Sequence, residues 1–418
     1  MKINNLIRSF VLLLTLAFAG SAWADLELRI SKTSDRGIPI VIAPMPGGVH
    51  TIIEADLNRS GRFQIVSSSR ATNIATFGAA VEPARLKMLG AAFLVRGRRT
   101  EAGLDIEIIS TVTGQRDSSY RIGNLANQRR LAHKAADKIF EYLVKLKGAF
   151  DTRLVYVTVE GRAIDQRVYR LYVADADGYN PRVVLTSRKP VMSPSWSYDG
   201  SQIAYVSFER GTPAIFTQNI FTGEKRMVSS RRGINGAPSW SPNGQQLALS
   251  LSVDGNPELY VLTLANGAFK RLTNSRAIDT EPNWTQDGRS IIFTSDRGGR
   301  PQLYEMPATG GSPKRVTYDG TYNSAADVVD NKIAFVRRVS GAFRIAIMER
   351  GRQGASVVSD GHFDESPSLA PNGTMVVYAT QNGGRGTLSV VSDNGYAKQE
   401  LFSPGGDVRE PAWSPYLR

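Results

Sequence analysis

The stretch Ser193–Ser207 reads SPSWSYDGSQIAYVS, and it returns several times along the second half of the chain. The further copies are Ala237–Leu251 (APSWSPNGQQLALSL), Glu281–Ser295 (EPNWTQDGRSIIFTS), Ser366–Thr380 (SPSLAPNGTMVVYAT) and a last opening at Glu410–Pro415. Trp196, Trp240 and Trp284 are 44 residues apart. A fixed period of about 20 to 50 residues is the signature of a repeat architecture.

Each copy of the repeat has the residues of a small antiparallel sheet. The Pro-x-Trp segment supplies a large apolar anchor, which we expect to lie between neighbouring sheets. Ser241–Gly244 (SPNG) favours a tight turn, because Pro presets φ, Asn tolerates the third position and Gly relaxes the fourth. Short apolar strands follow, as at Ile203–Val206 and Ile291–Thr294. Four short strands in about 43 residues match one blade of a β-propeller.

The number of repeats predicts six blades. Lys332–Val336 (KIAFV) marks a repeat whose opening, Asn323–Asp327, has lost the Pro and the Trp. The first unit, Arg153–Arg188, has three strands and no Pro-x-Trp opening, whereas the last unit has only the opening at Glu410. Because these two units complement each other, we predict an all-β six-bladed propeller over residues 151–418, closed by the C-terminal strand.

The N-terminal residues predict export. Met1–Ala24 has a basic start, an apolar core at Phe10–Ala19 and a small-x-small cleavage site that ends at Ala24. The core is about half of the ~20 residues that span a bilayer. An uncleaved membrane anchor is the alternative, but we expect an exported soluble protein. Asp25–Arg36 would then be an ordinary first strand or an arm that binds a partner by strand addition.

Residues 37–150 have a mixed pattern, which predicts an α/β domain. The expected strands are Ile38–Ala43, Phe63–Val66, Phe93–Arg96 and Leu104–Ser110, and the expected helices are Val49–Leu57, Pro83–Leu89 and Asn127–Lys147. The last helix is the clearest, because Asn127 can cap its start and Gly148 can stop it. His133 lies one position past the apolar row of this helix, so we expect it to be partly exposed.

Composition argues against several kinds of site. The chain has no cysteine, which excludes disulfides, thiol catalysis and cysteine metal sites. The net charge of +13 comes from Lys and Arg spread through turns, and this together with export argues against nucleic acid. His50, His133 and His362 lack zinc-ligand spacing, and no Gly-x-Ser-x-Gly elbow is present. We therefore expect no metal and no cofactor.

Carboxylates recur just before the Pro-x-Trp anchors. They are Asp279, Glu281, Asp364, Glu365 and Glu410. Because these segments lead into the innermost strands, the carboxylates could ring one mouth of the channel, a usual binding place on such a scaffold. A protein ligand with basic or backbone groups and a cation both remain open. The alternative from another class is a propeller hydrolase or lyase, or a metal-binding propeller, that uses these channel carboxylates.

Several segments are more specific than the repeat, and together they resemble the TolB family of the Tol-Pal system. These segments are Gly148–Arg153 (GAFDTR), Asp177–Asn180 (DGYN), Asn235–Pro238, Ser295–Arg297, Gly299–Gln302, Ser366–Val376 and Pro411–Leu417. The resemblance covers essentially the whole chain after the signal peptide.

The resemblance implies a periplasmic, non-catalytic binding protein that supports outer-membrane integrity and constriction at cell division. It implies that the lipoprotein Pal binds at the channel mouth, that the N-terminal arm binds TolA, and that the two events are coupled. Other outer-membrane proteins are possible further partners. We expect a monomer that is peripheral to the membrane.

The resemblance also implies site residues. Carried over position by position, the Pal face comprises Pro194, Asn235, Gly236, Ala237, Thr280, Glu281, Asp364, Glu365 and Ser366. The TolA arm would act through Asp25, Leu26, Leu28 and Ile30. Ile234 is left out of the Pal face, because a polar residue would suit a wet binding mouth better.

Overall fold

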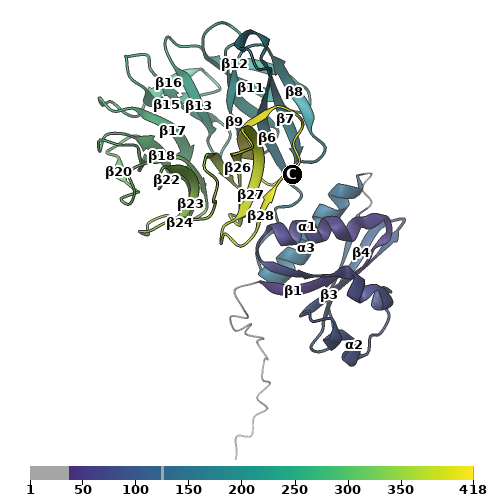
Figure 1. The fold of residues 1–418 in the computed structure, drawn as a ribbon. Helices are drawn as coiled ribbons and strands as arrows, with labels where there is room; N and C mark the ends of the chain where they lie inside the picture. The colour runs from purple at the N-terminus through teal and green to yellow at the C-terminus, as the bar shows by residue number, and fades with distance from the viewer. Residues whose placement is uncertain (1–36, 124–126, 418) are drawn as a thin grey trace, which may run out of the picture. The chain divides into compact units, whose positions relative to one another are not determined.

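The computed structural model describes residues 37–123 and 127–417, shown in Figure 1. The predicted signal peptide with its cleavage site at Ala24 lies outside these residues. The predicted arm, Asp25–Arg36, also lies outside them, and with it Asp25, Leu26, Leu28 and Ile30. No helix in the described part of the chain is long and apolar enough to cross a membrane.

The first body of the fold is a five-stranded mixed sheet in the order β2-β1-β3-β4-β5. Its strands are β1 (Ile38–Ile42), β2 (Phe63–Val66), β3 (Phe93–Thr100), β4 (Gly103–Ser110) and β5 (Arg116–Gly123). β1 pairs in parallel with β2 and β3, whereas β4 pairs antiparallel with β3 and β5. The α/β class predicted from the sequence is confirmed, and β5 is a strand that the sequence pattern did not predict.

Helices and short 3-10 turns cover both faces of this sheet. They are η1 (Pro46–Gly48), α1 (Val49–Arg59), η2 (Ser68–Ile74), α2 (Pro83–Met88) and α3 (Gln128–Val144). Side chains alternate between the faces of a strand. Ile40 and Ile42 of β1 therefore pack in the core under α1 and α3, while Val41 packs with Leu86 of α2 on the other face.

The capping of α3 agrees with the prediction at the start and differs at the end. The side chain of Asn127 accepts hydrogen bonds from the N–H groups of Arg129 and Arg130, as expected for an N-cap. The predicted end at Gly148 is wrong, because the helix stops at Val144 and Lys145 takes the left-handed conformation with φ 63°. The domain boundary between residues 150 and 151 stays a prediction.

Six four-stranded sheets follow, and they form a six-bladed propeller. Blade 1 contains β29 (Asp407–Trp413), β6 (Arg153–Glu160), β7 (Val168–Asp175) and β8 (Arg182–Ser187), with η3 (Ile164–Gln166) between β6 and β7. Blade 2 contains β9 (Val191–Trp196), β10 (Gln202–Ser207), β11 (Ala214–Asn219) and β12 (Lys225–Ser229). Blade 3 contains β13 (Asn235–Trp240), β14 (Gln246–Leu251), β15 (Glu258–Thr263) and β16 (Ala268–Arg271).

The remaining blades repeat the same order. Blade 4 contains β17 (Asp279–Trp284), β18 (Ser290–Ser295), β19 (Gln302–Pro307) and β20 (Lys314–Arg315). Blade 5 contains β21 (Asn323–Val329), β22 (Lys332–Val339), β23 (Ala342–Glu349) and β24 (Ser356–Val357). Blade 6 contains β25 (Asp364–Leu369), β26 (Met375–Asn382), β27 (Arg385–Ser392) and β28 (Lys398–Glu400).

Two features predicted from the repeat are confirmed. The last strand, β29, pairs antiparallel with β6, so the C-terminal strand closes the ring. The tryptophans pack between neighbouring blades: Trp196 of blade 2 lies against Val155 and Val157 of blade 1. In blade 5, which lacks the tryptophan, Val328 of β21 packs against blade 4 in its place.

Candidate functional site at the channel mouth

The first strands of the six blades, β9, β13, β17, β21, β25 and β29, contact one another in a ring around the central channel. Each of them contains a register shift against its partner strand. At each shift one non-glycine residue has a positive φ: Ser193 (51°), Ala237 (46°), Glu281 (54°), Ala325 (52°), Ser366 (52°) and Glu410 (49°). This conformation costs on the order of 1 kcal/mol at such residues, so the ring repeats the same backbone strain in every blade.

The bulges link neighbouring blades through hydrogen bonds from backbone N–H groups to side-chain carboxylates. The N–H of Ser193 in blade 2 donates to the carboxylate of Glu410 in blade 1. The N–H of Ala325 in blade 5 donates to Oε2 of Glu281 in blade 4 at 2.8 Å. Two of the predicted channel carboxylates therefore hold the blades together in addition to lining the channel.

The channel contains a cavity of about 450 Å³ that is lined by the first strands of all six blades. The charged residues of its described lining are Glu281, Asp327, Glu365 and Glu410, and no lysine or arginine is among them. In a chain whose net charge is +13, the channel is thus a local concentration of negative charge.

The lining carboxylates differ in their surroundings. Asp327 is half-buried and accepts hydrogen bonds from Nδ2 of Asn283 (3.0 Å) and from the N–H of Leu369 (2.6 Å), which ties blades 4, 5 and 6 together. Burial raises the pKa of Asp327, and these hydrogen bonds lower it in part. Burial also raises the pKa of Glu410. Glu365 is the exposed member of the group.

Two residues of the predicted Pal face lie below the surface of the mouth. Asn235 and Asp364 are buried and occupy equivalent positions three residues before the proline of their strands. Oδ1 of Asn235 accepts from the N–H of Arg231 at 2.9 Å, and a carboxylate oxygen of Asp364 accepts from the N–H of Gly361 at 3.0 Å. Through these hydrogen bonds the two side chains stabilise the loops that lead into their strands, so their role is structural.

Asp279 occupies the same position in blade 4. It is fully buried, and both of its carboxylate oxygens accept hydrogen bonds from Nη2 of Arg297, at 2.8 and 2.9 Å. Asp279 and Asp364, two carboxylates of the catalytic alternative, are therefore bound within their own blades.

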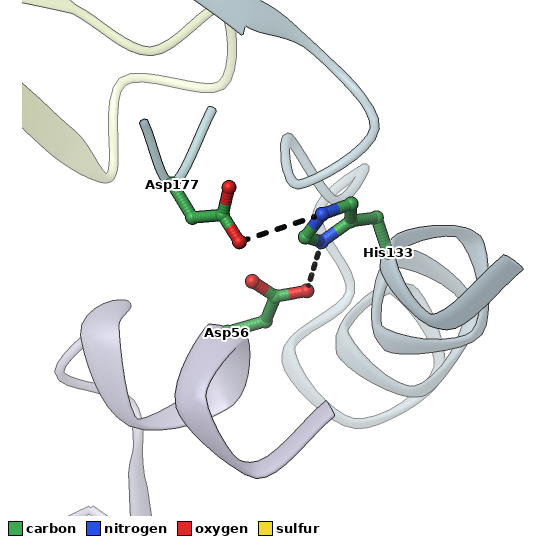
Figure 2. Close-up of side chains that lie close together, drawn as sticks. All are labelled: Asp56, His133 and Asp177. Carbon is green, nitrogen blue, oxygen red and sulfur yellow. Dashed lines mark hydrogen bonds and ion pairs between the residues drawn. The ribbon is translucent and has the colours of Figure 1, made fainter. Parts of the chain in front are cut away.

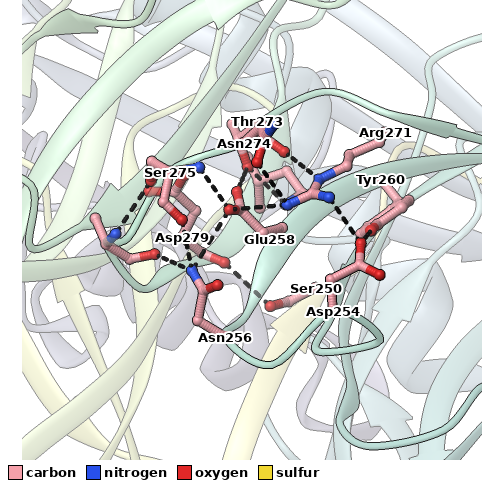
Figure 3. Close-up of polar contacts among 12 residues, drawn as sticks. Ser250, Asp254, Asn256, Glu258, Tyr260, Arg271, Thr273, Asn274, Ser275 and Asp279 are labelled. Atoms are coloured by element: carbon pink, nitrogen blue, oxygen red, sulfur yellow. Dashed lines mark hydrogen bonds and ion pairs between the residues drawn. The ribbon is translucent and has the colours of Figure 1, made fainter.

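A polar network of blade 3 supports the segment that enters β17 (Figure 3). Glu258 is buried, accepts from the N–H of Ser275 at 2.6 Å and pairs with Arg271 at 3.2 Å. Nδ2 of Asn256 donates to the carbonyl of Ala277 at 2.7 Å. This network fixes the loop before Asp279, so the mouth positions that follow, Thr280 and Glu281, sit on a rigid support.

Sequence reasoning missed an apolar feature of the mouth. The residue four positions before each proline position is apolar in four adjoining blades, and we call Ile234, Ile278, Tyr322 and Phe363 the apolar rim. The side chains of Ile234, Ile278 and Phe363 are 44–48% exposed. Ile234 was left out of the predicted Pal face because it was considered without the equivalent residues of the other blades. Aligning the repeats at this position would have shown that an apolar residue is the rule in these four blades.

The other predicted positions lie at the mouth. Pro194 is buried and lines the channel cavity, while Gly236, Ala237, Thr280 and Ser366 are half-buried on the first strands. The structure therefore brings residues of blades 2, 3, 4 and 6 to one end of the channel.

A second group of ionisable residues lies away from the mouth, where Asp56, His133 and Asp177 approach one another (Figure 2). The prediction that His133 is partly exposed is wrong: the residue is only 2% exposed. α1 and the turn between β7 and β8 cover it, which the pattern of its own helix does not show. Arg59 and Arg129 already pair with the two carboxylates, so this group is an ion-pair network.

Comparisons with known proteins agree with this fold. Two family models match the chain, the TolB beta propeller domain over residues 140–417 and the TolB amino-terminal domain over residues 26–115. A Tol-Pal system protein TolB of Xanthomonas oryzae pv. oryzae is 49% identical over 425 residues, which cover 97% of this chain and 96% of the relative. The protein of the same name in Xanthomonas euvesicatoria pv. vesicatoria is 50% identical over 410 residues, with 94% and 93% covered.

A solved structure matches over most of the chain as well. The crystal structure of TolB from Acinetobacter baumannii has a TM-score of 0.83 and 38% identity, and the match covers 92% of this chain and 98% of that chain. Sequence and structure thus point to one family.

Proposed function

The chain belongs to the TolB family, and from this premise we propose that its propeller mouth is the binding site for the lipoprotein Pal. Relatives matched over nearly the whole chain are named as Tol-Pal system proteins and not as enzymes. The observation that carries the proposal is the combination, at one end of the channel, of an exposed apolar rim with an acidic cavity.

The chemistry of the mouth suits a protein partner. Interfaces between proteins combine apolar anchors at the centre with polar groups around them, and a few anchors supply most of the binding energy. Ile278 and Phe363 offer exposed apolar surface, and Glu365 offers an exposed carboxylate. A partner segment with apolar side chains and a basic or N–H group would match this surface. The strained bulges favour a face that is formed before the partner arrives.

The proposed Pal face divides into residues that contact Pal and residues that support them. Gly236, Ala237, Thr280, Glu281, Glu365 and Ser366 are the direct contacts, together with the apolar rim. Pro194 shapes the channel, and Asn235 and Asp364 support the face from inside. No cofactor is required for this binding.

The remaining parts of the proposal concern the arm and the location. We propose that Asp25–Arg36 becomes the N-terminus of a periplasmic protein after cleavage at Ala24 and binds TolA. If its position affects Pal binding, the two states of the arm must differ in their affinity for Pal. Such a protein would link the partners that maintain the outer membrane and its constriction at division.

Calorimetry with the soluble domain of Pal tests this proposal. The mature chain from Asp25 and a form that lacks Asp25–Arg36 are titrated in parallel. We expect both to bind one Pal per chain with affinities that differ. Equal affinities would remove the coupling and keep the receptor. Absence of binding in both forms would overturn the proposed function.

A further inference from the structure

Three of the segments that carry the family resemblance lie at one place, where α3 meets blade 1. The N–H of Phe150, in the GAFDTR segment, donates to Oδ1 of Asp137 on α3 at 2.7 Å. The hydroxyl of Tyr416, in the C-terminal segment, donates to the carbonyl of Lys147 at 3.3 Å. The DGYN segment forms the turn between β7 and β8, with Asp177 facing α3. Partner binding at the mouth does not account for any of these residues.

His133 is the centre of this junction (Figure 2). Its Nδ1 lies 2.6 Å from Oδ2 of Asp56 on α1, and its Nε2 lies 3.6 Å from Oδ2 of Asp177 in the β7–β8 turn. The side chains of the three residues are 1–7% exposed. One imidazole therefore joins two carboxylates, one from the α/β domain and one from the propeller.

The charged groups around the His133 imidazole influence whether the ring is protonated. Arg59 on α1 pairs with Asp56, and Arg129 on α3 pairs with Asp177. Asp175 also interacts electrostatically with His133. Each bridging carboxylate thus has an arginine of its own, and neither depends on His133 for neutralisation.

The geometry distinguishes the two forms of the ring. A neutral imidazole carries one N–H, so one of its nitrogens would present a lone pair to a carboxylate. An imidazolium presents an N–H to Asp56 and another to Asp177. The second contact, at 3.6 Å, is an ion pair without a direct hydrogen bond, and it depends on the positive charge.

We propose that His133 is a proton-operated latch: its imidazolium ties Asp56 of α1 to Asp177 of the β7–β8 turn, and loss of the proton releases the turn from His133 and α1. The inference does not depend on the binding of Pal. It assigns a conformational control to the junction between the α/β domain and the propeller.

The pH range over which the latch opens follows from the direction in which the pKa of His133 is shifted. Burial alone would lower the pKa of His133, but the charges of Asp56 and Asp177 and the hydrogen bond to Asp56 outweigh burial and raise the pKa. A raised pKa means that the latch is fully closed below the unfolded value of about 6.5. It opens as the pH rises through the higher folded value.

The turn is held on the propeller side by contacts that do not titrate in this range. A Cβ on Gly178, which has φ 84°, would lie 2.1 Å from the carbonyl oxygen of Phe402. The ring of Tyr179 stacks on Phe402 at 5.1 Å. On the other side, Arg129 of α3 pairs with Asp177, and its guanidinium lies 4.0 Å from the centre of the Tyr179 ring. Loss of the proton would therefore separate the turn from His133 and α1 and leave it between Phe402 and Arg129.

Nuclear magnetic resonance of the histidine rings measures the pKa of His133 and so tests whether the ring carries the proton. The chain has three histidines, so His50→Gln and His362→Gln assign the signals. We expect the His133 ring to titrate above pH 6.5 and Asp177→Asn to lower its pKa. A His133 pKa at or below 6.5 in the unmodified protein would overturn the proposal.

Hydrogen exchange of the turn tests the release. The N–H of Tyr179 donates to Oδ1 of Asp177 at 3.2 Å and that of Gly178 to the carbonyl of Asp175, so both amides report on the part of the turn that carries the Asp177 carboxylate. After correction for intrinsic exchange, we expect their protection to fall as His133 deprotonates. The fall is about tenfold for each unit by which the pKa in the closed state exceeds that in the open state.

Variants complete the test. His133→Gln should show low protection at every pH, whereas the control His50→Gln should behave like the unmodified protein. If His133→Gln does not fold, Asp177→Asn should shift the transition in protection to lower pH. Protection that is independent of the His133 titration in the unmodified protein would overturn the latch.

Discussion

The Nε1–H of Trp413 donates a hydrogen bond of 2.8 Å to Oγ1 of Thr152, which lies 261 residues earlier in the chain. The bond joins the last strand, β29, to the segment that enters β6, so it lies where the propeller ring closes. Trp240 occupies the equivalent place in blade 3, but its buried Nε1 has no hydrogen-bond partner within the described residues.

This difference predicts unequal effects of one substitution. Trp413→Phe removes a buried hydrogen bond and leaves the hydroxyl of Thr152 without its donor, whereas Trp240→Phe removes ring volume alone. We expect Trp413→Phe to lower the free energy of unfolding by about 1–2 kcal/mol more than Trp240→Phe. Urea denaturation followed by circular dichroism measures both. Equal losses would show that the closing bond contributes nothing.

Gly148 is predicted to be intolerant of any side chain. A Cβ at this position would lie 2.4 Å from Cα of Asp137 in α3, which is a backbone atom that cannot move alone. We expect Gly148→Ala to destabilise the protein by about 1–3 kcal/mol, the usual range for overpacking. Gly405→Ala is the matched control, because a Cβ there meets nothing within 4 Å. A thermal melt in which the two variants match would contradict the packing argument.

The ion pair between Asp279 and Arg297 predicts that removing one partner destabilises the protein more than removing both charges. Arg297→Ala leaves the fully buried carboxylate of Asp279 unpaired, and breaking a buried pair in this way costs about 3–5 kcal/mol. Adding Asp279→Asn removes the unpaired charge, so the double variant should recover part of the loss. The exposed Arg188→Ala serves as control in the same calorimetric scan. A double variant less stable than Arg297→Ala would refute the role of the charge.

The raised pKa of Asp137 predicts that the free energy of unfolding depends on pH below neutrality. Burial raises its pKa to about 7, although the N–H groups of Phe150 and Asp151 lower it in part. Because the folded pKa exceeds the unfolded value of about 3.9, the folded state binds the proton more tightly. The contribution of this group to stability is therefore present below about pH 4 and is lost as the pH rises to 7.

Asp137→Asn removes this titration. We expect the variant to show a flatter decline in the free energy of unfolding between pH 4 and 7 than the unmodified protein. Urea denaturation at several pH values gives both curves. Parallel curves would mean that Asp137 titrates with an ordinary pKa.

The propeller was predictable because its repeat is carried by large residues at a fixed spacing. Trp196, Trp240 and Trp284 mark the blades directly, and the two incomplete units predict the closure. β5 was missed since its sequence, Arg116–Gly123, is largely polar and exposed; it is a strand because β4 offers it a partner.

The two errors at α3 have different causes. The burial of His133 depends on α1 and on the β7–β8 turn, so the periodicity of α3 alone cannot predict it. Gly148 resembles a helix stop, but its packing against Asp137 accounts for the glycine. Lys145 takes the left-handed position instead.

The sequence indicated the channel mouth as the candidate site, but it did not separate residues on the surface of the mouth from residues that support it from inside. Asn235 and Asp364 have the residue types of a binding surface, yet in the structure they brace loops from inside. Residue type alone cannot separate these roles, because both use the same hydrogen-bonding groups. The apolar rim was in the sequence, but it becomes visible only when the position of Ile234 is compared across blades.

The apolar rim gives the sharpest variants for the proposed binding site. Ile278→Glu and Phe363→Glu place a charge on side chains that are 48% and 44% exposed, so folding should be little affected. Ile164→Glu is the matched control, since Ile164 is 80% exposed and belongs neither to the apolar rim nor to the lining of the channel cavity. Thermal melts should place all three variants within a few degrees of the unmodified protein.

The most direct measurement is the affinity of the mature protein and these three variants for the soluble domain of Pal, by calorimetry at one pH and salt concentration. We predict that each rim variant binds Pal at least about thirtyfold more weakly, the loss of about 2 kcal/mol that defines an interface hot spot. Ile164→Glu should bind like the unmodified protein. Unchanged affinity in both rim variants, or no binding of Pal by the unmodified protein, would contradict the assignment of the mouth.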